Sequence, residues 1–419
     1  MPDHDLTTRA PSWPPALLRA RLDELILRAM AAATRDVGRG QLRVVMPSGR
    51  ALTIGRPSGV EASITLNSYA LFWKALRRGA IGAAESYIAG DFDTRDLSDV
   101  LRFFVDNEAA MAAAGRGFFR VRQPDRLRHR LRTNTRAGSR RNIAHHYDLG
   151  NDFYRTWLDA SMTYSSALYG AGPMTLEVAQ DAKYAAIIAA LELAPGHDLL
   201  EIGCGWGRMT ERAASLGARV TALTISREQL AFTRARLASA GLVSRAQAQF
   251  LDYRDAVGQY DRLVSIEMIE AVGEAHWPAY FRVVADRLRP GGIAVLQAIT
   301  MEEARFQRYR GKPDFIQQYI FPGGMLPTVP LMAARAEEMG LGFEVVTSFG
   351  LSYVTTLAEW RRRFDAAWPE LTRLGFDERF RRMWDYYLTY CAVGFERGAI
   401  DVGIYRLTKP AARSALAGV

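Results

Sequence analysis

The stretch LLEIGCGWG, residues 199–207, ends an apolar run with Glu201 and then places Gly203, Gly205 and Gly207 at alternate positions. Glycines between a strand and a helix allow a tight turn and let the backbone approach a ligand closely. The spacing E-x-G-x-G-x-G differs from the G-x-G-x-x-G of NAD sites, and the chain has no G-x-x-x-x-G-K-[ST] phosphate loop. The loop therefore favours a ligand without pyrophosphate, S-adenosylmethionine, over its competitor NAD.

Short apolar runs and helical segments alternate along the chain around this loop. The apolar runs are DLLEIGCG, ARVTALTIS, AQFLDY, YDRLVSIE and GGIAVLQAI, and segments such as REQLAFTRARLASAG separate them. This alternation is typical of a parallel, doubly wound sheet, which binds ligands beyond the carboxyl ends of its strands. We therefore expect an α/β fold with a Rossmann-like sheet.

A chain of 419 residues is too long for one ordinary core. Residues 16–34 have helical spacing, residues 41–55 resemble a β-hairpin, and short helices follow. We predict a small α+β domain over residues 1–115, a basic linker over 116–142 and the Rossmann-like domain over 143–419.

The linker is rich in arginine and contains a single acid, Asp125, within a chain of net charge +9. Such a segment suits an anionic partner, and an anionic membrane surface is the partner we expect. A solvated linker is the alternative. Nucleic acid ranks lower, because Phe118 and Phe119 lie at one end of the segment and are not interleaved with the arginines as base stacking requires.

The cellular location is predicted from features that signal membrane insertion or secretion. The first residues lack the apolar core of a signal peptide, and no uncharged apolar stretch reaches the ~20 residues of a transmembrane helix. The two cysteines, Cys204 and Cys391, are expected to be reduced thiols. We predict a cytoplasmic protein, peripheral on the inner face of the cytoplasmic membrane, with no bound metal and with a homodimer as a candidate assembly.

Strand ends supply further candidates for the cofactor site. The second apolar run ends at Thr224 without the acid that usually binds ribose hydroxyls, and Gln229 could replace it as a neutral partner. Asp252 is placed to accept a hydrogen bond from the adenine amino group, and Tyr253 to pack on the ring.

Several motifs, taken in order, carry a resemblance to a known family. They are HHYDLGNDFYRTWLDASMTYSSALY (145–169), LLEIGCGWG (199–207), LTISREQ (223–229), LDYRD (251–255) and YIFPGGMLPTV (319–329). Over roughly residues 40–408 the chain resembles the cyclopropane fatty acid synthases, which use S-adenosylmethionine (SAM) to methylate the cis double bond of a phospholipid acyl chain. The resemblance implies that Tyr164 and Ser165 contact the methionine part of SAM, and that the N-terminal domain handles lipid.

In that family a buried bicarbonate is thought to accept a proton after methyl transfer. Carried over by position, its ligands are Glu270, Ile299 and Tyr353, whereas the cysteine position is Ser166 and the histidine position is Gln297. Two neighbouring positions also depart from the family pattern. Ala271 replaces a usual histidine, and Glu267 replaces a small residue.

Two interpretations of Glu267 stay open at this point. Either it faces solvent, with the substitutions as drift, or its carboxylate replaces bicarbonate, so that the proton leaves another carbon and a methyl-branched alkene forms instead of a ring. Two other classes compete with the lipid methyltransferase: a methyltransferase for a small soluble metabolite and a non-catalytic lipid-binding protein. The N-terminal domain argues against the first, and the intact glycine loop against the second.

Overall fold

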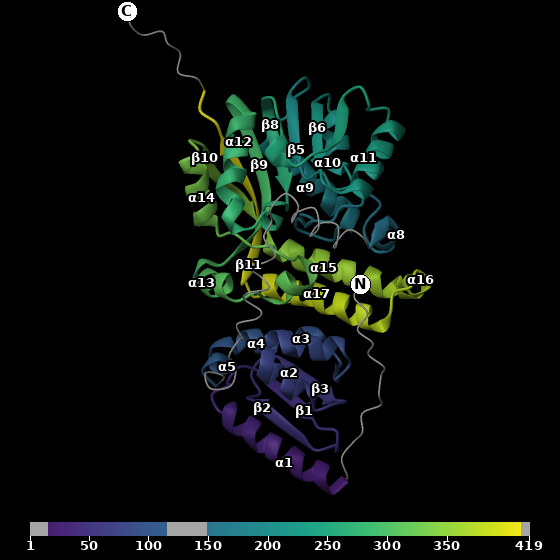
Figure 1. The fold of residues 1–419 in the computed structure, drawn as a ribbon, viewed down its shortest axis with the longest axis vertical. Coiled ribbons are helices and arrows are strands. Elements are labelled where there is room, and N and C mark those ends of the chain that lie inside the picture. The colour runs from purple at the N-terminus through teal and green to yellow at the C-terminus, as the bar shows by residue number, and fades with distance from the viewer. Residues whose placement is uncertain (1–15, 115–148, 412–419) are drawn as a thin grey trace, which may run out of the picture. The chain divides into compact units, whose positions relative to one another are not determined.

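The computed structural model describes residues 16–114 and 149–411, and these residues form parts of two compact units (Figure 1). The first unit contains residues 1–122 and 377–393, and the second contains residues 123–376 and 394–419. The predicted basic linker falls among the residues outside the described ranges, so its membrane role stays a prediction.

The first unit contains a four-stranded sheet in the order β2-β1-β3-β4. Strands β1 and β2 pair as the antiparallel hairpin that the sequence predicts, and β1 pairs with β3 in parallel. The strands are β1 (Gln41–Val45), β2 (Ala51–Gly55), β3 (Glu61–Leu66) and β4 (Phe92–Thr94), and the helices are α1 (Ala16–Ala33), α2 (Ala70–Arg78), α3 (Ala80–Ile88), α4 (Leu97–Asp106) and α5 (Glu108–Ala114).

Most of helix α17 (Glu378–Glu396) belongs to this first unit, although the sequence analysis placed it in the Rossmann-like domain. Polar contacts explain the difference. The Tyr87 hydroxyl donates to Asp385 at 2.7 Å, and Arg382 donates to the Tyr87 carbonyl at 2.5 Å and to Asp93 at 2.8 Å. These side chains are far from Tyr87 in sequence, so local patterning does not reveal the association.

The second unit is built on a seven-stranded sheet in the order β10-β11-β9-β8-β5-β6-β7. Strands β5 to β9 pair in parallel, which confirms the predicted doubly wound fold, and β10 and β11 add an antiparallel edge that the sequence analysis did not identify. The strands are β5 (Asp198–Ile202), β6 (Arg219–Thr224), β7 (Ala246–Phe250), β8 (Tyr260–Ile266), β9 (Leu288–Met301), β10 (Gly342–Ser348) and β11 (Ile400–Thr408).

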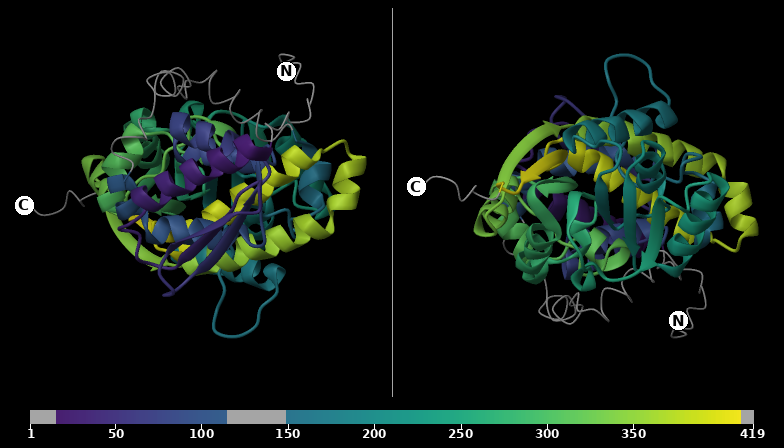
Figure 2. Two further views of the ribbon diagram at one scale, coloured as in Figure 1. Left: turned by 90° about the horizontal axis from the view of Figure 1, so that it is seen from below. Right: turned by 90° about the horizontal axis from the view of Figure 1, so that it is seen from above.

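Helices pack along this sheet, as Figures 1 and 2 show. Helix α10 packs on β6, α11 on β7, α12 on β8 and β9, and α14 on β10. The helices of the unit are α8 (Gly150–Arg155), α9 (Leu176–Ala190), α10 (Arg208–Ser215), α11 (Arg227–Ser239), α12 (Trp277–Arg287), α13 (Glu303–Gly311), α14 (Val329–Glu338), α15 (Gly350–Ala366) and α16 (Trp368–Arg373), with short turns η1 (Tyr253–Asp255), η2 (Ile269–Ala271), η3 (Glu274–His276) and η4 (Ile316–Ile320).

The core of the second unit is apolar and aromatic. Leu200, Leu263 and Leu296 from the central strands are fully buried, as are Trp360 and Phe364 of α15. Within the described part of the chain, no helix combines the length and the apolar character needed to cross a bilayer.

Candidate active site

The glycine loop follows β5, and all three of its glycines have a positive φ. A Cβ at Gly203 would meet Met268 at 2.9 Å and a Cβ at Gly207 would meet Thr233 at 2.5 Å, whereas a Cβ at Gly205 would meet no atom within 4 Å. Gly203 and Gly207 are therefore required for packing inside the protein. The backbone at Gly205 is instead open to approach by a ligand, as a SAM-binding loop requires.

Glu201, the acid of the motif, is buried at the end of β5 and accepts a hydrogen bond from the Thr210 hydroxyl of α10. Burial raises the pKa of Glu201 to about 8. This side chain links the strand to the helix after the loop, so its observed contact is with the scaffold of the site.

The other predicted cofactor residues lie at the ends of β6 and β7. Thr224 donates to the Gln229 side chain at 3.0 Å, and both residues are buried. Arg254 donates to both carboxylate oxygens of Asp252, at 2.8 and 2.6 Å. The backbone N–H of Arg254 also donates to Asp252 Oδ1, at 3.0 Å. The predicted contact of Asp252 with adenine stays a prediction. Tyr253 packs edge-on against Tyr280 with ring centroids 5.5 Å apart.

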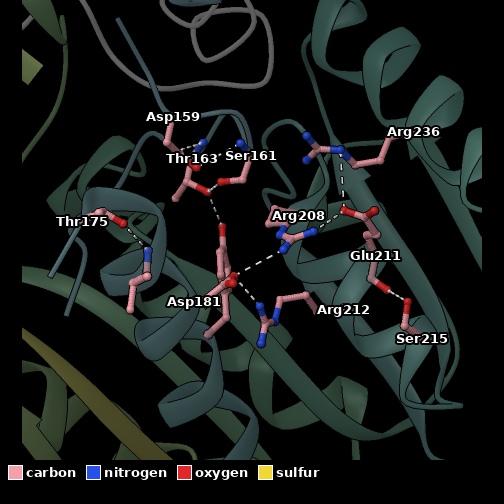
Figure 3. A network of polar contacts seen from close by, with 12 residues as sticks. Asp159, Ser161, Thr163, Thr175, Asp181, Arg208, Glu211, Arg212, Ser215 and Arg236 are labelled. Carbon is pink, nitrogen blue, oxygen red and sulfur yellow. Dashed lines mark hydrogen bonds and ion pairs between the residues drawn. The ribbon is translucent and has the colours of Figure 1, made fainter. Parts of the chain in front are cut away.

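A loop before α9 carries Tyr164, Ser165 and Ser166, and polar contacts hold it at several points (Figure 3). The buried carboxylate of Asp159 accepts from the N–H groups of Ser161 and Thr163, and Thr163 contacts the Tyr184 hydroxyl of α9 at 3.0 Å. Asp181 of α9 in turn pairs with Arg208 and Arg212 of α10. The loop is thus fixed against α9, and ion pairs join α9 to α10, the helix that follows the glycine motif.

Two side chains of α9 hold Ser165 itself. The Lys183 ammonium donates to the Ser165 hydroxyl at 2.7 Å, and the Gln180 amide donates to the Ser165 carbonyl at 2.9 Å. The Tyr164 ring lies among Tyr154 and Trp360, with centroid distances of 5.4 and 5.3 Å. The candidate cofactor residues Tyr164 and Ser165 are therefore held rigidly.

The carboxylate of Glu267 lies at the centre of a second polar cluster. Its Oε1 accepts from the Ser166 N–H at 2.8 Å and from the Gln297 side-chain amide at 2.7 Å, and its Oε2 accepts from the Tyr353 hydroxyl at 2.8 Å. Glu267 directly follows β8, as predicted for the carboxyl edge of the sheet. It has a left-handed φ of 47°, which is uncommon for a residue other than glycine.

Glu270 lies in η2, one turn beyond Glu267. Its Oε1 accepts from the Ile299 N–H at 2.5 Å, while its Oε2 and the Gln297 Oε1 are buried without a hydrogen-bond partner. Buried polar atoms of this kind are rare and often mark functional sites.

Burial and mutual repulsion set the charge of these two acids. Burial raises the pKa of Glu267, and hydrogen bonds and the Lys183 charge act in the opposite direction. Burial together with the Glu267 charge raises the pKa of Glu270 to about 8. The two acids differ in their hydrogen bonds: Glu267 accepts from three donors, and these favour its charged form over that of Glu270.

Comparison with known proteins identifies the family of the chain. Residues 134–404 match the family described as mycolic acid cyclopropane synthetase. The chain belongs to this family. It is 37% identical over 402 residues to the tuberculostearic acid methyltransferase of Mycobacterium tuberculosis, covering 94% of this chain and 92% of that protein. It is 35% identical to the cyclopropane-fatty-acyl-phospholipid synthase of Escherichia coli (strain K12), covering 83% and 87%.

A solved structure of a mycolic acid cyclopropane synthase in complex with S-adenosylhomocysteine and CTAB has a TM-score of 0.60 to this chain at 32% identity. It covers 64% of this chain and 98% of that one. The chain is thus a SAM-dependent methyltransferase of the cyclopropane synthetase family, and its reaction is methylation or cyclopropanation of lipid acyl chains.

The interpretation that Glu267 faces solvent is wrong for this chain. Three of the five residues carried over as bicarbonate ligands, Ser166, Gln297 and Tyr353, donate to its carboxylate. The hydroxyl of Ser166 instead donates to the Ala167 carbonyl, so the backbone of Ser166 makes the contact. Ile299 donates to Glu270. The donors that would hold bicarbonate are therefore occupied by protein carboxylates.

Lys183, Gln180 and Asp159 fix the loop that carries Ser165 and Ser166, and none of the three was predicted from the sequence. A signal for Lys183 was present, because the segment KYAAIIAAL places a lysine at the start of an apolar helical run. A charged residue at such a position is rarely fully buried unless it is paired. Asp159 lies in a region without helical or strand periodicity and had no comparable signal.

Proposed function

We propose that this enzyme transfers a methyl group from SAM to the cis double bond of a phospholipid acyl chain, and that Glu267 accepts the proton lost afterwards. The product proposed is a methyl-branched unsaturated acyl chain. One observation carries the proposal: the Glu267 carboxylate accepts hydrogen bonds from three of the five residues that the family resemblance assigns to bicarbonate.

The SAM site proposed consists of the loop around Gly205, Tyr164 and Ser165 before α9, and the strand-end residues Thr224, Gln229, Asp252 and Tyr253. The chemistry that SAM supplies when bound is an electrophilic methyl group, whose addition to an alkene leaves a positive charge on the acyl chain. Tyr353 and Trp360 lie edge-on with centroids 6.0 Å apart, and aromatic rings at this position can stabilise a nearby cation.

Glu267 would complete the reaction by removing a proton. One C–H bond of the cation breaks, its electron pair forms a C=C bond, and the proton moves to the Glu267 carboxylate. A carboxylate held in place by three donors can take a proton from one fixed direction only, and this direction selects the carbon that loses it. In this proposal Glu267 takes the role that bicarbonate has in the family, so the reaction does not require bicarbonate.

The names of relatives support a branched product. The relative that matches 94% of the chain is named a tuberculostearic acid methyltransferase, and another, 30% identical over 75% of the chain, is a sphingolipid C9-methyltransferase of Emericella nidulans. The Escherichia coli relative is instead named for a cyclopropane product. Both product classes thus occur among the relatives, and Glu267 is the feature that we propose favours the alkene.

Access to phospholipid is proposed for the first unit and the basic linker. Helix α2 has no buried residue; its Trp73 is 63% exposed, and Arg77 and Arg78 lie in its last turn. A helix with exposed aromatic and basic side chains is typical of one that lies in a membrane interface. Binding to vesicles of anionic phospholipid should weaken with rising salt. Equal binding to neutral and anionic vesicles would contradict this part of the proposal.

The product test uses cells that express the chain and receive methyl-deuterated methionine. We expect modified acyl chains that take up hydrogen under mild catalytic hydrogenation, because they keep a double bond. Mass spectrometry then counts the deuterons: three mean that a chain carbon lost the proton, and two mean that the new methyl group lost it. A product that resists mild hydrogenation and keeps two deuterons is a cyclopropane and would overturn the proposal.

A further inference from the structure

Lys183 is the buried charged side chain that the proposed reaction does not yet use. It lies in the middle of α9 with 0% of its surface exposed. Its ammonium donates to the Ser165 hydroxyl at 2.7 Å and lies 4.3 Å from the centre of the Tyr184 ring. A fully buried ammonium is costly unless an opposite charge lies nearby, so the location of its partner matters.

Three acids act on Lys183: Glu267, Asp159 and Glu201. Glu201 has a pKa raised to about 8 by burial and is bonded to Thr210, so it is mainly protonated at neutral pH. Asp159 is engaged by the N–H groups of Ser161 and Thr163. Of the three acids, Glu267 raises the pKa of Lys183 the most.

Two hydrogen bonds to adjacent residues link Lys183 to Glu267. Lys183 holds the hydroxyl of Ser165, and the N–H of the next residue, Ser166, donates to Glu267 Oε1 at 2.8 Å. The cation and the carboxylate thus contact neighbouring residues of one segment, and each influences the charge of the other. The ammonium therefore both holds the donor of Glu267 in place and lies close enough for its charge to favour the ionised carboxylate.

We infer that Lys183 is a positioning residue for the proton acceptor: from α9 it holds the Ser165–Ser166 segment against Glu267, and its positive charge favours the Glu267 carboxylate. This inference rests on the proposed function of Glu267. The inference gives the two acids of the site, Glu267 and Glu270, different charge states. The charge of Lys183 favours the anion at Glu267, and the anion at Glu267 favours the proton at Glu270.

The test measures the pH dependence of kcat/KM for methyl transfer with SAM and phospholipid vesicles. The charged or titratable groups that face Glu267 are Lys183, Tyr353 and Glu270. Lys183→Met removes both the charge and the hydrogen bond. Lys183→Gln removes the charge but keeps a donor for Ser165. Gln180→Met is the matched control, because it removes the other contact of α9 with Ser165 and leaves the charge in place.

Loss of the cation raises the pKa of Glu267, so both Lys183 variants should move the acidic limb of the profile to higher pH, by about one unit or more. Activity should fall about tenfold near pH 7 and recover most of that loss near pH 9. Gln180→Met should lower activity equally at all pH values. If the Lys183 variants keep the wild-type midpoint, or if Gln180→Met shifts it as much, the inference is wrong.

Two further measurements separate this inference from the proposed function. If Lys183→Met does not fold, the pH profile of Lys183→Gln alone tests the inference, and a melting curve shows that this variant is folded. If Glu267→Gly leaves rate and product unchanged, the proposed function itself fails. If Glu267→Gly behaves as proposed and the Lys183 variants show no shift of midpoint, only the role of Lys183 is overturned.

Discussion

The glycine loop after β5 and the acid cluster after β8 lie at the same edge of one sheet, yet they depart from the family pattern to different degrees. The loop keeps its motif, and Gly205 keeps the open backbone that a ligand needs. The cluster carries substitutions at Ser166, Glu267 and Gln297, and all three residues are joined by hydrogen bonds. Under the proposed function, this difference means that the site that supplies the methyl group keeps the family pattern, whereas the residues that remove the proton have changed together.

Of the variants that distinguish the glycine loop from the acid cluster, Glu267→Gly is expected to have the largest effect on turnover. Removal of the proton acceptor should lower turnover about 10³-fold in carbonate-free buffer, within the range typical of a lost general base. SAM affinity, measured by calorimetry, should change less than about threefold. Added bicarbonate should restore part of the activity, because the donors of Ser166, Gln297 and Tyr353 become free, whereas chloride at equal ionic strength should not.

In the glycine loop, Gly205→Val should weaken SAM binding at least about 100-fold, because the side chain would fill the open side of the loop backbone. Gly241→Val is a matched control: Gly241 also has a positive φ, of 68°, and a Cβ there would likewise meet no atom within 4 Å. Both variants should lose similar stability, about 1–2 kcal/mol, from the left-handed backbone. Unchanged SAM affinity in Gly205→Val would contradict the site assignment.

Glu270→Gln tests the charge state of the acid cluster through stability. The pKa of Glu270 is raised to about 8 in the folded protein, so between about pH 5 and 8 the folded state binds more protons than the unfolded state. The free energy of unfolding of the wild type should therefore fall as pH rises through this window. Glu270→Gln does not titrate, so its free energy of unfolding relative to that of the wild type should rise by about 3–4 kcal/mol from pH 5 to pH 8. Glu344→Gln, at an exposed site, is the control.

The smallest effect is expected for a change of product. The combined variant Glu267→Gly, Ser166→Cys, Gln297→His restores the family residues in the acid cluster. Supplied with bicarbonate, it should raise the ratio of cyclopropane to alkene about tenfold over wild type, measured by mass spectrometry after mild hydrogenation. An unchanged ratio would mean that these residues do not select the product.

The parallel core of the sheet was predictable because β5 to β9 are short apolar runs separated by helical segments. The edge strand β10 was not, since Glu344, Val345 and Val346 are all exposed and show no alternation between buried and exposed positions. The glycine loop was predictable from its spacing. The members of the acid cluster were identified only through the family resemblance. Whether Glu267 faces solvent or the site could be decided only from the three-dimensional structure, because its partners are residues 166, 297 and 353.

The same limit applies to Lys183 and Asp159. Their roles depend on a loop of irregular backbone, in which Met162 also has a positive φ, of 57°. Neither periodicity nor a motif predicts the course of such a loop. The residues that hold a site in place are therefore harder to predict than the residues that compose it.

The left-handed backbone at Glu267 bears on how such a site can arise. A φ of 47° is a conformation that glycine adopts without penalty, so a chain with glycine at this position already has the backbone that the glutamate needs. The glycine codons GGA and GGG become the glutamate codons GAA and GAG by one base change. A lineage could thus acquire an internal proton acceptor in a single mutational step, with the main chain unchanged, and could lose it again as easily.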